Sequence, residues 1–209
     1  MLDGAMRKII DPPLNRVGKW LAAMGVSANS VTLAGLALGL LAAMLIVFGN
    51  YSAALVFVLL SRLADGLDGA IARATRRTDF GGYLDIVADF LFYGAIPLAF
   101  AIANPEENAI AAAVLLLSFY VNGATFLGYS ALAERHGLST KDRGEKNLYF
   151  TDGLLEGTET IAFFVVICVW PEFFVLLAYI FAAATFYTSI MRVLRARRQF
   201  SGTTEDEPE

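Results

Sequence analysis

Long apolar runs separated by short polar connections dominate the chain. They are expected at 29–48, 52–77, 80–103, 109–133, 153–170 and 172–195. Each run is close to, or longer than, the roughly 20 residues that an α-helix needs to span a bilayer. The pattern predicts an all-α integral membrane protein with six transmembrane helices.

The N-terminal part has a different pattern. Residues 2–10 and 14–24 place apolar side chains at helical spacing beside basic ones, which is typical of amphipathic helices lying on a membrane surface. Pro12-Pro13 is expected to stop the first of these helices. We expect no signal peptide, because Arg7 and Lys8 are followed by this Asp-Pro-Pro stretch and not by an apolar region with a cleavage site.

Three regions follow from these patterns. Residues 1–26 are predicted to form amphipathic juxtamembrane helices, and residues 27–198 a six-helix transmembrane domain. Residues 199–209, which end in EDEPE, are predicted to be an acidic disordered tail. The overall composition agrees, since 57% of the residues are hydrophobic, against about 45–50% in soluble domains. The excess must face lipid.

Basic residues are confined to one side of the predicted bundle. The connections GNYS and NPEEN and the turn at Pro171-Glu172 contain no Lys or Arg. All 16 basic residues fall on the other side, counting Arg62 and Arg73 in the half of the second run that lies nearest to it. Cytoplasmic loops are enriched in Lys and Arg, so both termini are predicted to be cytoplasmic. We expect a multi-pass protein of a prokaryotic inner membrane.

Cysteine and histidine exclude several kinds of site. The chain has one of each, Cys168 in an apolar run and His136 in a polar connection. A disulfide within the chain is therefore impossible, and neither a zinc site nor a Ser-His-Asp or Cys-His arrangement is plausible.

Five aspartates interrupt the second and third runs, which a short turn near 76–79 must join into an antiparallel hairpin. Counted from Arg77, Asp68 lies nine residues before and Asp85 eight after, while Asp65 and Asp89 each lie twelve away. A helix rises about 1.5 Å per residue, so the members of each pair are expected at matching depths. The fifth, Asp79, falls in the turn and is expected to be solvated.

Spacing on each helix places these carboxylates together. Asp65 and Asp68 are three residues apart, and Asp85 and Asp89 four, so each pair lies on one helix face. Converging carboxylates repel one another, and hard divalent cations such as Mg²⁺, Mn²⁺ or Ca²⁺ would compensate them. The alternatives are an interhelical salt-bridge cluster with the nearby arginines or a solvated helix end. Intramembrane carboxylates also leave open a cation or proton transporter.

The sequence Asp65-x-x-Asp68-Gly69-x-x-Ala72-Arg73, seven residues, Gly81-x-x-x-Asp85-x-x-x-Asp89 resembles the signature of the CDP-alcohol phosphotransferase family. The resemblance covers nearly the whole chain. It implies an enzyme of phospholipid biosynthesis that transfers a substituted phosphate from a CDP-linked lipid, often CDP-diacylglycerol, to a hydroxyl acceptor, and releases CMP. It also implies two divalent cations, Mg²⁺ or Mn²⁺, and a homodimer. The expected partners are this lipid donor, a small alcohol acceptor and membrane lipids, with no nucleic acid.

The resemblance assigns roles to individual residues. Asp65, Asp68 and Asp85 would bind the metal ions, and Asp89 would share metal contact or act as the general base. The CDP site would be lined by Gly69, Ala72, Arg73 and Gly81. The expected active site lies in the cytoplasmic half of the membrane.

Two features leave alternatives open near the nucleotide site. Family members commonly have a Pro-Asn…Thr element before the first span, and here the sequence is SANSVT, with Ala28 in place of the proline. Asn29 and Thr32 remain and could contact the nucleotide. Alternatively, Ser27 or Asn29 could cap the helix that begins here. Gly66 and Gly69 cost about 1 kcal/mol each in a helix relative to Ala. They would admit either a ligand or a neighbouring helix.

The acceptor site is the least defined part. Glu156 and Glu159 lie three residues apart near the start of the fifth run and could bind acceptor hydroxyls or an amine, or pair with arginines. Arg62 could bind a phosphorylated acceptor. The acidic pair slightly favours a polyol or an amino-alcohol.

Overall fold

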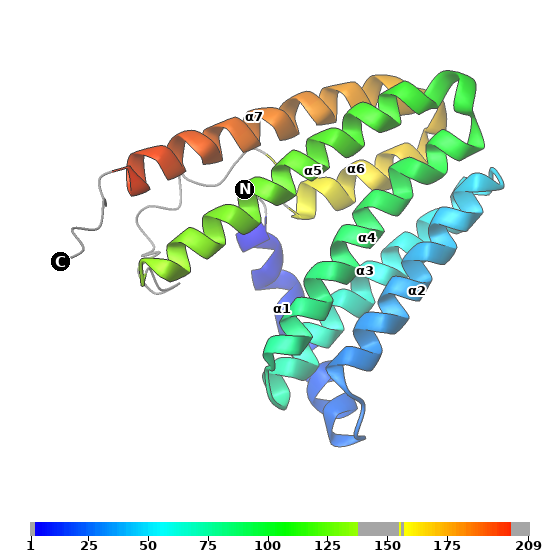
Figure 1. Cartoon of the computed structure of the whole chain (residues 1–209). Helices are drawn as coiled ribbons and strands as arrows, with labels where there is room; N and C mark the ends of the chain where they lie inside the picture. The colour runs from blue at the N-terminus through cyan, green and yellow to red at the C-terminus, as the bar shows by residue number, and fades with distance from the viewer. Residues whose placement is uncertain (1–2, 138–154, 156, 202–209) are drawn as a thin grey trace.

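The computed structural model describes residues 3–137, 155 and 157–201. Over these residues the chain forms helices joined by short connections, and no strand occurs in these ranges. The elements are α1 (Asp3–Ala23), α2 (Ala28–Val47), α3 (Tyr51–Ala74), α4 (Asp79–Ala103), α5 (Pro105–Arg135), α6 (Gly157–Val169), the 3₁₀ turn η1 (Pro171–Phe173) and α7 (Phe174–Phe200) (Figure 1).

Polar caps and glycines set the helix boundaries. The side chains of Ser27, Asn50 and Thr78 each accept a hydrogen bond from the backbone N–H three residues later, at 3.1, 3.3 and 3.0 Å, at the starts of α2, α3 and α4. These bonds satisfy N–H groups that the helix leaves without partners. Gly25 and Gly49 have φ values of +81° and +72°, which let the chain leave α1 and α2 in a left-handed conformation. The capping role predicted for Ser27 is confirmed.

Within the part of the chain that the structure describes, four helical segments are long and apolar enough to cross a membrane. They are Ala28–Val47, Asp79–Ala103, Pro105–Arg135 and Pro171–Phe200. The described part of α6 has only 13 residues, and α3 carries four charged side chains from Arg62 to Arg73. The protein is an all-α, multi-pass membrane protein, and six spans remain a prediction.

The prediction that Pro12-Pro13 ends the first amphipathic helix is wrong. Helix α1 runs through both prolines from Asp3 to Ala23. A proline inside a helix removes one backbone hydrogen bond and crowds the carbonyl four residues earlier. Both prolines lie on the exposed side of α1, where solvent or lipid head groups can reach the carbonyls that lose their donors.

The helices form two groups (Figure 1). Helix α2 packs against both α3 and α4, and α5 packs along α7. Contacts of α4 with α5 and of α3 with α6 join the groups, while α1 packs against α3. Between α1 and α3 the approach is very close: a Cβ added to Gly18 would lie 2.6 Å from the Cβ of Ala70.

Stacked aromatic side chains fill the centre of the bundle. Phe100 of α4 stacks on Phe174 of α7 with ring centroids 4.4 Å apart, and Phe163 of α6 stacks on Phe181 of α7 at 4.3 Å. Phe100 lies near the end of α4, far along the helix from the α3–α4 turn. The Phe100–Phe174 stack therefore lies at the end of the bundle away from the turn, whereas the clustered aspartates lie in the turn-side half of the hairpin.

Candidate metal and nucleotide site

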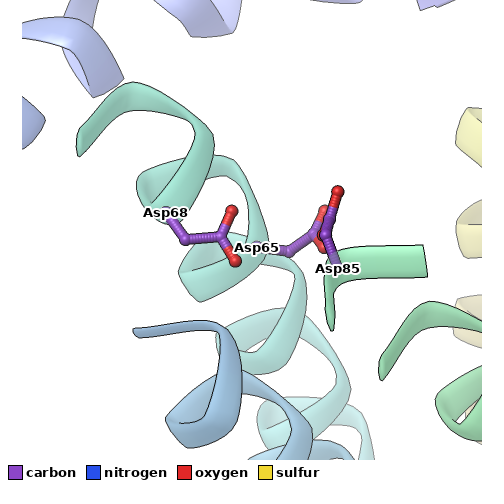
Figure 2. A group of neighbouring side chains, drawn as sticks. All are labelled: Asp65, Asp68 and Asp85. Atoms are coloured by element: carbon purple, nitrogen blue, oxygen red, sulfur yellow. The ribbon is translucent and has the colours of Figure 1, made fainter. Parts of the chain in front are cut away.

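The α3–α4 hairpin brings three carboxylates to one place. Asp65 and Asp68 project from α3 and Asp85 from α4, and one oxygen from each lies within 4.8 Å of the other two (Figure 2). The helices end at Ala74 and begin again at Asp79, which confirms the predicted hairpin. Asp79 itself is exposed at the start of α4, as expected.

Asp68 is the most deeply placed of these carboxylates. Only 6% of the residue is exposed, and its Oδ2 accepts a 2.6 Å hydrogen bond from the hydroxyl of Thr32 on α2. A buried carboxylate needs such a partner, because burial without one costs several kcal/mol. Thr32, which was predicted to contact the nucleotide, thus binds a predicted metal ligand and fixes its orientation.

Asp89 is held differently. It is not among the three clustered carboxylates; its Oδ1 accepts a 2.7 Å hydrogen bond from Nη1 of Arg62, one helix over on α3. The same nitrogen lies 3.7 Å from Oδ1 of Asp65. Arg62 therefore links the predicted general base to a predicted metal ligand.

The charge balance fits a site for divalent cations. Within the described ranges, Arg62 is the cation paired with Asp65 and Asp89, and no ion pair reaches Asp68 or Asp85. One guanidinium cannot compensate four carboxylates, so a salt-bridge cluster alone does not explain the arrangement. Clustered carboxylate oxygens are the donor set that Mg²⁺ and Mn²⁺ prefer, and the residues present fit such ions.

The predicted nucleotide residues lie around the turn-side end of the hairpin. The Arg73 guanidinium donates two hydrogen bonds to Oδ1 of Asn15 on α1, at 3.1 and 2.9 Å, and a Cβ on Gly69 would lie 3.2 Å from Nη1 of Arg73. Ala72 is half-buried one residue before this arginine. A Cβ on Gly81 would lie 3.2 Å from Oδ1 of Asn29, so the starts of α2 and α4 approach closely here.

The two glycines of α3 differ in their surroundings. A Cβ on Gly66 would lie 2.7 Å from Cδ1 of Leu14 on α1, so helix packing accounts for Gly66. Around Gly69 the nearest group is the flexible end of Arg73. Space for a ligand is thus left at Gly69 and not at Gly66.

The predicted acceptor residues are placed only in part. Glu156 lies outside the described residues, and Glu159 is half-buried in the first turn of α6. Nη1 of Arg192 on α7 donates to the backbone and side-chain oxygens of Asn122, at 3.0 and 2.8 Å, and to Thr125 at 3.0 Å. A second polar cluster thus links α5 to α7.

Some residues of the site were not found from the sequence. Phe92 and Ser61 contact the Arg62 guanidinium; since Phe92 lies three residues after Asp89, helical spacing could have indicated it. Asn15 gives no such signal, because its contact with Arg73 depends on how α1 lies across α3.

Comparison with known proteins identifies the family to which the chain belongs. The sequence model described as CDP-alcohol phosphatidyltransferase matches residues 25–191. Over 193 residues the chain is 44% identical to the inner membrane protein YnjF of Escherichia coli, covering 92% of this chain and 94% of that protein. It is 28% identical over 170 residues to the archaetidylinositol phosphate synthase of Pyrococcus horikoshii, covering 80% and 90%.

The fold is similar to that of the phosphatidylinositol phosphate synthase PgsA1 of Mycobacterium tuberculosis. The crystal structure with CDP-DAG bound gives a TM-score of 0.69 at 21% identity, covering 88% of this chain and 93% of that one. The structure in complex with manganese and citrate gives 0.67 at 22%, covering 87% of each. The transporter alternative finds no support in any of these comparisons.

Proposed function

Because the chain belongs to the CDP-alcohol phosphatidyltransferase family, we propose that it transfers a phosphatidyl group from CDP-diacylglycerol to the hydroxyl of a small alcohol and releases CMP. One observation carries the proposal. The α3–α4 hairpin brings the carboxylates of Asp65, Asp68 and Asp85 together, and Arg62 links Asp89 to Asp65. The bound CDP-DAG named for the mycobacterial structure supports this donor.

In this proposal Asp65, Asp68 and Asp85 bind two divalent cations, Mg²⁺ or Mn²⁺, with Asp89 in reach of the same site. Such ions neutralise the negative charge of a pyrophosphate and polarise its phosphorus for attack. Thr32 keeps the Asp68 carboxylate turned towards the cluster. The manganese named for the mycobacterial structure supports this class of ion.

The nucleotide would lie beside these carboxylates, over Gly69, Ala72 and Gly81. The absence of a side chain at Gly69 allows the donor to approach the backbone, and Gly81 lies beside Thr78 and Asn29 at the edge of the same site. Arg73 would bind a phosphate of the donor, and Asn29, close to Gly81, would contact the nucleotide. Thr32 contributes to this part of the site through Asp68.

Asp89 is proposed as the general base. Its carboxylate takes the proton of the acceptor hydroxyl, and the acceptor oxygen forms a bond to the phosphorus that carries the diacylglycerol. The bond from that phosphorus to the bridging oxygen of the pyrophosphate breaks, and CMP leaves with the bonding electrons. Glu159 and Glu156, on the α6 side, are proposed to bind further hydroxyls or an amine of the acceptor.

We further propose how the protein sits in its membrane. Six spans with both termini in the cytoplasm would place the site in the cytoplasmic half of a prokaryotic inner membrane. There the acyl chains of the donor remain in lipid and the cytidine in water. Helix α1 would lie at the membrane surface, and two copies would form a homodimer. The acidic tail predicted from residue 199 would begin only after α7, because this helix continues to Phe200.

The test is CMP release by purified protein. CDP-diacylglycerol is incubated with Mg²⁺ or Mn²⁺ and, one at a time, with glycerol, inositol, glycerol 3-phosphate, inositol phosphate, serine and choline, and the lipid product is identified by mass. We expect CMP to form with one class of alcohol. Asp65→Asn should abolish it, and Asp79→Asn, the same change at an exposed position, should not. Metal-dependent ion flux into liposomes without a nucleotide requirement would contradict the proposal.

A further inference from the structure

The Arg62 side chain is buried and is held by contacts from several neighbouring residues. Its side chain is 9% exposed. The guanidinium carbon lies 3.9 Å from the centre of the Phe92 ring, a close cation–π contact with a fully buried side chain. Nη2 donates to Oγ of Ser61 at 3.2 Å, and Ser61 in turn donates to the carbonyl of Gly35 on α2 at 2.8 Å.

The contacts with Phe92 and Ser61, and that of Ser61 with Gly35, fix the plane of the Arg62 guanidinium. Three helices contribute to these contacts: α2 through Gly35, α3 through Ser61 and α4 through Phe92. Nε of Arg62 is buried and has no hydrogen-bond partner among the described residues, and an unsatisfied buried donor of this kind lowers stability. The fold tolerates this cost at a position where Nη1 faces two carboxylates, those of Asp89 at 2.7 Å and Asp65 at 3.7 Å.

We propose that Arg62 is the positioning residue of Asp89. By bridging Asp89 to Asp65, it sets the distance between the base and the metal ligands, so that the acceptor oxygen, once deprotonated, lies next to the activated phosphorus. This deepens the proposed function and rests on the role given there to Asp89. A base must come within about 2.6–3.2 Å of the proton that it removes, and a displacement of about 1 Å can cost about 100-fold in rate.

The geometry explains why the residue is an arginine. Nη1 and Nη2 reach different partners while the flat face rests on Phe92. A lysine offers one compact ammonium and no plane to stack, so it can keep the charge but not the full set of contacts. The rival role is binding of the acceptor phosphate, in which Arg62 would act on the affinity for acceptor and not on turnover.

The experiment compares Arg62→Met and Arg62→Lys with wild type and with Arg77→Met, a matched change at an exposed position in the turn. Steady-state CMP release gives kcat, the KM for alcohol and for CDP-diacylglycerol, and the Mn²⁺ concentration for half-maximal rate. We expect Arg62→Met to lower kcat about 100-fold, with both KM values and the Mn²⁺ requirement within twofold of wild type. Arg62→Lys should fall between the two, and Arg77→Met should match wild type.

A double variant tests the link between the two residues. If Arg62 acts through Asp89, adding Arg62→Met to Asp89→Asn should lower kcat no further than Asp89→Asn alone. A rise in the alcohol KM at unchanged kcat, or wild-type kinetics of Arg62→Lys, would overturn the inference. If Arg62→Met does not yield folded protein, the kcat of Arg62→Lys alone decides. Full turnover by Asp89→Asn would instead refute the base assigned under the proposed function.

Discussion

The hydroxyl of Thr32 and the carboxylate of Asp68 form the shortest polar contact of the site, at 2.6 Å. Substitution of a residue that hydrogen-bonds to a metal ligand, without binding the metal itself, typically changes the metal affinity about 10- to 100-fold. We therefore expect Thr32→Val to raise the Mn²⁺ concentration for half-maximal CMP release by about tenfold, with kcat at saturating Mn²⁺ close to wild type. Thr185→Val is the control, since Thr185 is equally buried and bonds only its own helix, through the carbonyl of Phe181. An unchanged Mn²⁺ requirement in Thr32→Val would count against the role of Asp68 as a metal ligand.

Arg73 offers a second prediction at the scale of single residues. Its guanidinium is held by Asn15 through two exposed hydrogen bonds. Asn15→Ala removes both bonds, so the Arg73 side chain is no longer held in position for the donor. A loss of about 1 kcal/mol in binding free energy corresponds to a roughly fivefold rise in the KM for CDP-diacylglycerol. Turnover at saturation should not change. Asn104→Ala removes a comparable exposed bond, to Glu107, and should leave this KM unaltered, as the steady-state assay would show.

Much of this site could be predicted from residue spacing. Helical periodicity and a short turn are sufficient to bring Asp65, Asp68 and Asp85 together, and the structure confirms that grouping. The same reasoning placed Asp89 in one set with them, whereas in the structure its carboxylate binds Arg62, which links it to Asp65, and it is not one of the three clustered carboxylates. Which carboxylate an arginine binds depends on the packing of its guanidinium, here on the Phe92 ring, and spacing along a helix does not encode that choice.

At the scale of elements, the approach of α2 to α4 depends on Gly39. A Cβ at this position would lie 2.5 Å from Cδ2 of Phe92, the ring that carries the Arg62 guanidinium. Gly39→Ala therefore forces a buried aromatic ring to move, and overpacking of this kind typically costs about 1–3 kcal/mol. We expect a lower midpoint of thermal unfolding in detergent and a lower kcat.

Gly82→Ala is the matched control for that change. Gly82 also lies within a helix, but nothing approaches within 4 Å of a Cβ placed there. Alanine is favoured over glycine in a helix by up to about 1 kcal/mol, so the unfolding midpoint should be unchanged or higher. Equal destabilisation by the two substitutions would show that the α2–α4 contact is not limiting.

The helices themselves were predicted well where hydrophobic runs were long. The third run, expected at 80–103, is α4 at Asp79–Ala103, because Thr78 caps its start and an Asn-Pro pair follows its end. The expected break at Pro12-Pro13 failed because local propensity competes with packing: Leu14 and Gly18 of α1 lie against Gly66 and Ala70 of α3, and these contacts keep the helix continuous.

At the scale of the whole molecule, the distribution of basic residues predicts on which side of the membrane the carboxylates lie. The α3–α4 turn contains Arg76 and Arg77, whereas the opposite end of α4 is followed at once by Glu106 and Glu107 in the first turn of α5. The carboxylates lie in the turn-side half of the hairpin. The positive-inside rule predicts that the carboxylates, and with them the proposed nucleotide site, face the cytoplasm.

Cysteine labelling tests this orientation in intact cells. Cys168 is the single cysteine of the chain, so Cys168→Ala provides a background into which Glu106→Cys, Glu172→Cys or Arg76→Cys is introduced, all at exposed positions. A membrane-impermeant maleimide should label the first two from outside, and Arg76→Cys only after the membrane is permeabilised. Labelling of Arg76→Cys in intact cells would place the carboxylates on the side that lacks CDP-linked donors, and would contradict both the orientation and the source of the donor.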